Sequence, residues 1–235
     1  MNTNPTTPPP WDRVVATLEA WRKGLQEEQR PEDPGSAEPA VSTVAEHYKR
    51  DPWAILVSTI ISLRTKDAVT LTVSQGLLQK APDPASLQAL PEEDLARLLY
   101  PAGFYRTKAA NLKKIAAILL DQYQGRLPAR MEELLALPGV GRKTANLVLT
   151  EAFDQDGICV DVHVHRISNR LGWVRSVTPE QTETALRQTL PRKYWKGINA
   201  LLVLYGQRLC RPVSPFCSRC VIHPYCERRG VERFR

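Results

Sequence analysis

The stretch "ALPGVGRKTANLVL" at residues 136–149 is the part of the sequence that best indicates the fold. An apolar run ends at Pro138, Gly139 and Gly141 follow, and a second apolar run then begins. Glycine tolerates a left-handed backbone and leaves no side chain in the way of a close approach. The pattern therefore predicts two helices joined by a tight turn, the second helix running over about 143–153.

The turn itself predicts a binding site for an anion. The first amide N–H groups of a helix have no partner inside the helix, and they carry the positive end of its dipole. We therefore expect Gly139, Val140, Gly141 and Arg142 to bind a phosphate group. Such a helix-hairpin-helix holds a nucleic-acid backbone without reading the bases. An ordinary helix–helix turn is the alternative, and a G-x-G pair by itself favours that alternative.

Lys143 is the candidate nucleophile, because it opens the second helix of this hairpin. The positive helix end and the neighbouring Arg142 both disfavour the protonated amine. A partly neutral lysine can form a Schiff base, and the sugar cation that then develops needs a carboxylate beside it. Asp161, in the apolar stretch "ICVDVHV", is the candidate for that carboxylate. The alternatives are a solvated lysine and an aspartate that only caps a helix, although a capping role is compatible with catalysis.

Four of the five cysteines follow the spacing C-x6-C-x2-C-x5-C, and they are Cys210, Cys217, Cys220 and Cys226. The chain shows no secretion signal, so a metal site is favoured over disulfides. Zinc sites of four cysteines usually show two close pairs, so this uneven spacing favours an iron–sulfur cluster while zinc stays possible. The fifth cysteine, Cys159, is interpreted as a core residue.

Charge and composition limit the class of protein. The 235 residues are 43% apolar with a net charge of +7, and the polar, proline-rich start "MNTNPTTPPP" predicts an intracellular protein. No apolar run is long enough to span a bilayer. Residues 206–235 hold seven Arg against two Glu, which favours a polyanionic partner such as nucleic acid.

Helical spacing of apolar residues recurs along the chain and no strong strand pattern does, so the predicted fold class is all-α. Asp161 is expected to cap a helix that Gly172 ends, and Thr178 with Gln181 forms a capping box for the next helix. Further helices are expected over 11–29, with Val14, Val15, Leu18 and Trp21 on one face, over 51–67 and over about 192–209. A second helix after a Pro/Gly turn is expected to place Leu112, Ile115, Ala116, Leu119 and Tyr123 on one stripe.

Taken together, these motifs resemble the endonuclease III family of DNA glycosylases. "LPGVGRKTAN" is similar to the family's hairpin, "VDVH" to its catalytic aspartate segment 18 residues after the lysine, and the cysteine spacing to its iron–sulfur loop. "GFYRTKAANL" and "SLRTKD" resemble two further segments of the family. The likeness covers about residues 45–228.

The resemblance implies two helical domains with a DNA-binding cleft between them. One is a six-helix barrel with the helix-hairpin-helix, and the other carries the iron–sulfur cluster. The expected boundaries are a disordered arm at 1–10, an N-terminal helix and linker of the cluster domain at 11–44, the barrel at 45–155 and the remainder of the cluster domain at 156–235.

The implied activity is that of a bifunctional DNA glycosylase and AP lyase of base excision repair. Such an enzyme removes oxidised pyrimidines of the thymine glycol type from damaged double-stranded DNA. Lys143 would attack the sugar C1′, Asp161 would stabilise the transition state, and β-elimination would cut the strand on the 3′ side. The four cysteines would hold a [4Fe–4S] cluster. The expected protein is a cytoplasmic monomer associated with the bacterial nucleoid, without a membrane partner.

Two residues depart from the family pattern. Arg64 stands where the family typically has glutamine, and Phe104 stands where it has an intercalating leucine. Both side chains have a flat face that can fill the gap left by a flipped base. His163 matches a family histidine near the lesion strand, and Arg208 and Arg219 are expected to contact phosphates.

Two other functions stay open for the same motifs. One is a mismatch or adenine glycosylase built on the same scaffold. The other is a redox-responsive DNA-binding protein without catalysis, in which Lys143 only contacts a phosphate.

Overall fold

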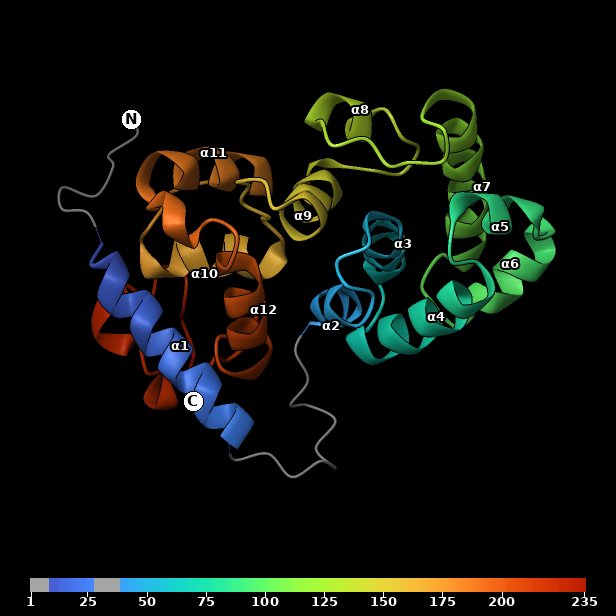
Figure 1. The fold of residues 1–235 in the computed structure, drawn as a ribbon. Coiled ribbons are helices and arrows are strands. Elements are labelled where there is room, and N and C mark those ends of the chain that lie inside the picture. The colour runs from blue at the N-terminus through green and yellow to red at the C-terminus, as the bar shows by residue number, and fades with distance from the viewer. Residues whose placement is uncertain (1–8, 28–38) are drawn as a thin grey trace. The chain divides into compact units, whose positions relative to one another are not determined.

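The computed structural model describes residues 9–27 and 39–235, and within these ranges it contains helices and no strand (Figure 1). The all-α prediction is confirmed. Residues 1–8 of the expected disordered arm, and most of the expected linker, lie outside the described residues. None of the helices in the described ranges is long and apolar enough to cross a membrane.

The chain packs as two compact units, and the first combines the N-terminal helix with residues 158–235. It contains one helix from the start of the chain, three from its last third and three short 3-10 turns. These elements are α1 (Trp11–Glu27), α10 (Val162–Leu171), α11 (Pro179–Thr189), η1 (Arg192–Tyr194), α12 (Ile198–Arg208), η2 (Cys217–Arg219) and η3 (His223–Tyr225).

The core of this first unit depends on the apolar face of α1. Val14 and Leu18 are fully buried in one cluster with residues of α10, α11 and α12. The Trp11 ring lies 4.6 Å from that of Trp173, and the Trp21 ring lies 4.8 Å from that of Tyr205. Figure 1 shows α1 running beside the C-terminal helices that it covers. The helical face predicted from the spacing is therefore the buried one.

The predicted continuous helix over 192–209 is wrong in its first third. The structure has the 3-10 turn η1, then Trp195 to Gly197, and only then α12. Gly197 is the N-cap of α12, and the Trp195 indole N–H donates back to the Leu190 carbonyl at 2.8 Å. The guanidinium of Arg187 lies 5.1 Å from the Trp195 ring centre. These contacts fix the tryptophan before the helix begins.

The second unit covers residues 39–157 of the described chain. Its helices are α2 (Ala40–His47), α3 (Pro52–Ser62), α4 (Asp67–Lys80), α5 (Pro84–Ala89), α6 (Glu92–Leu99), α7 (Tyr105–Gln122), α8 (Met131–Leu135) and α9 (Arg142–Phe153). Residues 40–44, expected in the linker, belong to α2, which packs on α3 and α4.

Helix α3 forms the centre of the second unit. Asp51 caps it by accepting the Ala54 N–H at 2.8 Å, and Pro52 occupies its first position. Residues 53–61 are all buried, and α3 packs on α2, α4, α7 and α9. Its β-branched residues are compatible with a strand, but a segment covered on every side by helices is a buried helix, as predicted.

On α7 the predicted stripe is buried apart from Tyr123, which is half-buried at the helix end.

Candidate functional site

The hairpin predicted at residues 136–149 is present between α8 and α9. The Val140 N–H donates to the Leu137 carbonyl at 3.1 Å, which closes the turn. Gly139 has φ +79°, and a Cβ at this position would lie 2.5 Å from the side-chain nitrogen of Asn111. Glycine is therefore required here both by the left-handed backbone and by the approach of α7.

The N-terminal end of α9 is accessible at this turn. Gly141 is the N-cap, and no side-chain hydrogen bond caps the helix. Gly139, Gly141 and Arg142 are exposed, and Lys143 in the first turn is half-buried. An anion can therefore approach the positive end of a twelve-residue helix without meeting a capping side chain.

Asp161 caps α10, as the sequence predicted. It is 9% exposed, and its Oδ1 accepts the backbone N–H groups of His163 at 2.8 Å and Val164 at 2.9 Å. The helix ends at Gly172, which has φ +83°. Lys143 belongs to the second unit and Asp161 to the first, so the two candidate catalytic residues come from different cores.

Arg166 lies beside the candidate site, although no pattern in the sequence indicated it. Its guanidinium lies 3.1 Å from His163 Nδ1 and donates to the Cys210 carbonyl at 2.9 Å. Burial lowers the pKa of this guanidinium. A Cβ at Gly206 would overlap His163 Nδ1, so the glycine of α12 makes room for the pair. The spacing of His163 and Arg166 on α10 is visible in the sequence, but their contact with Cys210 is not.

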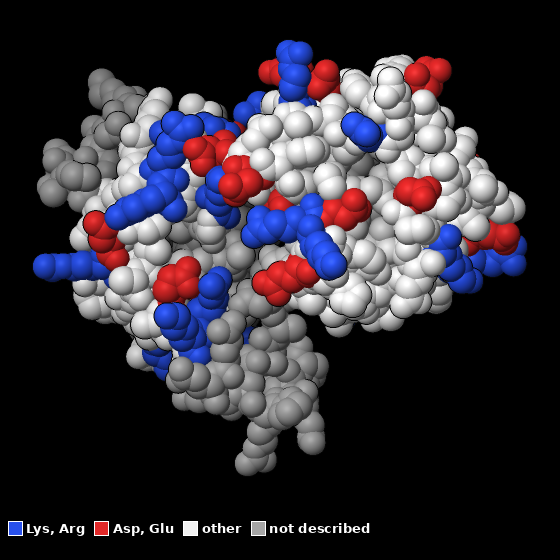
Figure 2. All heavy atoms as spheres, viewed as in Figure 1, with Lys and Arg blue, Asp and Glu red and all other residues white. Residues whose placement is uncertain are grey.

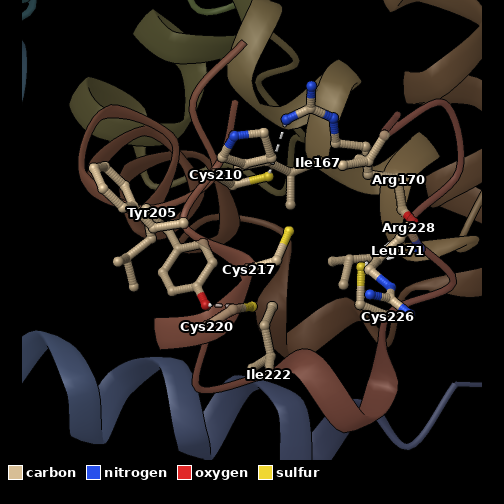
Figure 3. Close-up of a pocket in the computed structure, with 14 residues that line it drawn as sticks. Ile167, Arg170, Leu171, Tyr205, Cys210, Cys217, Cys220, Ile222, Cys226 and Arg228 are labelled. Atoms are coloured by element: carbon tan, nitrogen blue, oxygen red, sulfur yellow. Dashed lines mark hydrogen bonds between the residues drawn. The ribbon is translucent and has the colours of Figure 1, made fainter. Parts of the chain in front are cut away.

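The four clustered cysteines line one cavity of the first unit (Figure 3). Cys210 follows α12, Cys217 begins η2, and Cys220 and Cys226 follow the two 3-10 turns. Within the described ranges, no three His, Cys, Asp or Glu side chains are arranged to hold one metal ion. A four-iron cluster poses a different requirement, because each thiolate binds a different iron around a larger centre. The shared cavity fits that requirement.

Hydrogen-bond donors point at several of these sulfurs. The Tyr205 hydroxyl lies 3.1 Å from Cys220 Sγ, and Arg170 Nη1 donates to Cys210 Sγ at 3.5 Å, as Figure 3 shows. Burial raises the pKa of the Cys226 thiol to about 11. Donors of this kind suit sulfurs that a metal centre holds as thiolates. The residue pattern alone did not indicate Tyr205 or Arg170.

Basic side chains also gather on the loop between the cysteines. The Phe216 ring has the guanidinium groups of Arg211, Arg219 and Arg235 at 5.2, 5.8 and 4.3 Å from its centre. Arg208, expected to contact phosphate, is half-buried, and its Nη2 has no hydrogen-bond partner among the described residues. On the face in Figure 2, basic and acidic side chains are interspersed, so that face shows no patch of a single sign.

Arg64 and Phe104 lie together on the second unit. The Arg64 guanidinium lies 5.3 Å from the Phe104 ring centre, and Phe104 is 61% exposed. Both residues have a left-handed backbone, with φ of 54° and 56°. The two departures from the family pattern therefore form one exposed pair.

Comparisons with known proteins agree with this geometry. Residues 57–192 match the family described as "HhH-GPD superfamily base excision DNA repair protein". The chain is 46% identical over 192 residues to "Endonuclease III" of Thermotoga maritima, covering 80% of this chain and 90% of that protein. It is 41% identical over 228 residues to "Endonuclease III homolog 2, chloroplastic" of Arabidopsis thaliana, of which it spans 58%.

A solved structure extends the likeness to three dimensions. The structure titled "Structure of a Trapped Endonuclease III-DNA Covalent Intermediate: Estranged-Adenine Complex" aligns with a TM-score of 0.75 at 30% identity. The alignment covers 92% of this chain and 95% of that one. The resemblance seen in the sequence is therefore confirmed.

Proposed function

Because the chain belongs to the endonuclease III family, within the HhH-GPD superfamily of base excision DNA repair proteins, we propose that it removes oxidised pyrimidines of the thymine glycol type from duplex DNA. Membership makes it a DNA glycosylase with AP lyase activity. The relatives that solved structures show bound to DNA support duplex DNA as its partner. We propose that it acts as a monomer.

The hairpin carries the proposal. Its glycine corner leaves the positive end of α9 open to a phosphate, and Lys143 lies in the first turn of the same helix. A phosphate held at this turn would place the neighbouring sugar within reach of an amine nucleophile.

The proposed reaction begins with the neutral Lys143 amine attacking C1′ of the deoxyribose. The bond between C1′ and the base breaks, and the base leaves with the electron pair and takes a proton. Nζ then loses a proton. The C1′–O4′ bond breaks, O4′ takes a proton, and the opened sugar carries a protonated imine between Nζ and C1′. Removal of a C2′ proton expels the 3′ phosphate, which cuts the strand, and water releases the lysine.

Asp161 has two roles in this proposal. Its Oδ1 accepts two backbone N–H groups, which fixes the carboxylate at the start of α10. A fixed negative charge stabilises the positive charge that develops on the sugar as the base departs. His163, two residues later, would contact the lesion strand.

The remaining candidate DNA contacts would hold the DNA backbone and fill the space left by the extruded base. Gly139, Val140, Gly141 and Arg142 would bind the backbone of the damaged strand, with Arg208 and Arg219 on further phosphates. Extruding the damaged base leaves a gap in the stack. The exposed pair of Arg64 and Phe104 would fill it.

We propose that Cys210, Cys217, Cys220 and Cys226 hold a [4Fe–4S] cluster. The cavity that they share, and the hydrogen-bond donors at Cys210 and Cys220, support this ligand set. When bound, the cluster supplies a one-electron redox centre and fixes the basic loop around Phe216 in place.

Borohydride trapping tests the nucleophile, because it reduces the imine to a stable covalent link with abasic-site DNA. We expect Lys143→Gln to abolish the trapped complex while duplex binding stays within about threefold. Lys114→Gln, which removes an exposed lysine of α7, is the control and should trap normally. A Lys143→Gln protein that still traps would show that another amine is the nucleophile.

A substrate panel tests the lesion class. Duplexes with thymine glycol, dihydrouracil, 5-hydroxycytosine or an adenine mismatch separate the proposed activity from that of a mismatch glycosylase. Excision of mismatched adenine alone would contradict the proposal. Binding of all duplexes without any cleavage would instead indicate a DNA-binding protein without catalysis.

A further inference from the structure

One buried lysine lies directly beneath the pair of Arg64 and Phe104. Lys108 of α7 is 5% exposed, and its Nζ donates to the carbonyls of Ile61 and Leu63, each at 2.7 Å, and to Thr65 Oγ1 at 2.9 Å. An ammonium group has three donors, so these three acceptors satisfy it completely. The two carbonyls lie at the C-terminal end of α3, where a positive charge is favoured.

The same network joins two surface loops. Thr65 Oγ1 also accepts the Gly103 N–H at 3.1 Å. A Cβ at Gly103 would overlap the Arg64 carbonyl oxygen, so the loop at 100–104 touches the loop at 62–66 backbone to backbone. The Thr65 hydroxyl oxygen therefore accepts hydrogen bonds from both Lys108 and Gly103, and so links the lysine to both loops.

Through its side chain, Lys108 fixes the backbone on both sides of Arg64. It contacts Leu63 and Thr65, the residues immediately before and after Arg64. Its own N–H donates to the Phe104 carbonyl at 3.0 Å, because Phe104 is the N-cap of α7. A left-handed backbone at a non-glycine residue is unfavourable and persists only where the surroundings enforce it. At Arg64, the hydrogen bonds from the Lys108 side chain to the two neighbouring residues hold this backbone in place.

We propose that Lys108 is a positioning residue, which locks Arg64 and Phe104 into one preformed unit that fills the gap left by an extruded base. This inference rests on the proposed function of that pair. Preorganisation lowers the entropy that has to be lost when the pair enters the stack. Lys108 itself does not need to touch DNA.

A purely structural role is the alternative, and the chain offers a matched control for it. Lys113 lies on the same helix and donates to the carbonyls of Gln88 at 2.5 Å and Leu90 at 2.8 Å, at the end of α5. The Lys113 ammonium group therefore also caps the C-terminal end of a helix, but that helix is α5, whereas Lys108 caps α3, the helix before Arg64. Lys108→Met and Lys113→Met therefore remove the same kind of interaction at different places.

Two measurements on the full-length protein test the proposal. The first is amide hydrogen exchange without DNA. Lys108→Met should raise exchange at residues 62–66 and 103–105 by about tenfold, and Lys113→Met should leave these amides unchanged. Thr65→Val, which keeps the lysine and removes its shared acceptor, should raise exchange at the same amides. Unchanged exchange in Lys108→Met would overturn the proposal whatever the enzyme acts on.

The second measurement compares two substrates under single-turnover conditions. Lys108→Met should slow excision of thymine glycol from a fully paired duplex about tenfold, but cut a preformed abasic site at nearly the normal rate, because no paired base has to be extruded there. Lys113→Met should change neither rate. Equal losses on both substrates would show a general structural defect and overturn the positioning role. Failure of the unaltered protein on thymine glycol would instead refute the proposed function.

Discussion

At position 139 the backbone needs glycine for two independent reasons. Its φ of +79° is unfavourable for any residue with a Cβ, and a Cβ would also meet Asn111 at 2.5 Å. Gly141, two residues later, has φ −96°, and a Cβ added there would meet no atom within 4 Å. The two glycines of one motif thus differ in what they do for the fold.

We expect Gly139→Ala to lower the free energy of unfolding by about 2 kcal/mol, because strain and the displacement of Asn111 add together. Gly141→Ala should change it by less than about 0.5 kcal/mol. Urea unfolding followed by circular dichroism measures both values. Equal effects of the two substitutions would show that the left-handed turn and the Asn111 contact contribute little.

Residues whose role depends on near neighbours were predictable, and those with distant partners were not. Asp161 and Gly172 bound one helix, so the sequence alone places the cap and the stop. Lys108 makes its three contacts 43 to 47 residues away, and Arg166 reaches Cys210 across 44 residues. No local pattern can encode such a pairing, since it exists only once the helices have packed.

At the scale of one element, the start of α10 combines a structural and a chemical role in a single carboxylate. Asp161 Oδ1 accepts two N–H groups of the first turn. Asparagine caps a helix about as well as aspartate but carries no charge. The two roles can therefore be separated by one substitution.

Asp161→Asn should leave the free energy of unfolding within about 0.5 kcal/mol of normal, since the cap is kept. Base excision should fall by a factor of about 100 or more, because the charge that stabilises the sugar cation is lost. Asp161→Ala should lose both the activity and about 1 kcal/mol of stability. Chemical unfolding and single-turnover excision measure these outcomes, and an active Asp161→Asn protein would assign the aspartate to capping alone.

The C-terminal segment is a second element whose role appears only in the structure. The backbone of Arg235 pairs with the loop between the cysteines, donating to the Pro215 carbonyl at 2.8 Å and accepting the Ser218 N–H at 3.0 Å. Its guanidinium lies 4.3 Å from the Phe216 ring centre, beside those of Arg211 and Arg219. The residue thus adds a third positive charge to this loop.

If that loop contacts a phosphate, Arg235→Ala should reduce the dependence of duplex affinity on salt by about one unit of log–log slope. Arg233→Ala removes the same charge from an exposed position two residues earlier, and it should change the slope by much less. Fluorescence anisotropy at several salt concentrations measures the slope. The same decrease in both variants would mean that only net charge matters.

At the scale of the whole molecule, the sequence predicted the class and the motifs better than the connections between them. Periodic apolar spacing is a local property, so the helices and the buried faces of α1 and α7 followed from it. The break before α12 did not, because it depends on Trp195 packing against Arg187 and donating to Leu190. The pairing of α1 with residues 158–235 was expected only from the family resemblance, because it depends on contacts between the two ends of the sequence that no local pattern encodes.

Two separate cores predict that damage to the cysteine site stays local. Cys210, Cys220 and Cys226 pack against the core of the first unit, whereas the second unit has its own centre in α3. Cys217→Ser should therefore lose bound iron and raise amide exchange over residues 209–229, while residues 53–61 and 109–119 keep their protection. Cys159→Ala is the control, because Cys159 is buried outside the ligand set and its loss should leave the iron content normal. Iron analysis with hydrogen exchange measured by mass spectrometry gives both readouts, and loss of protection in α3 would show that the two cores are not independent.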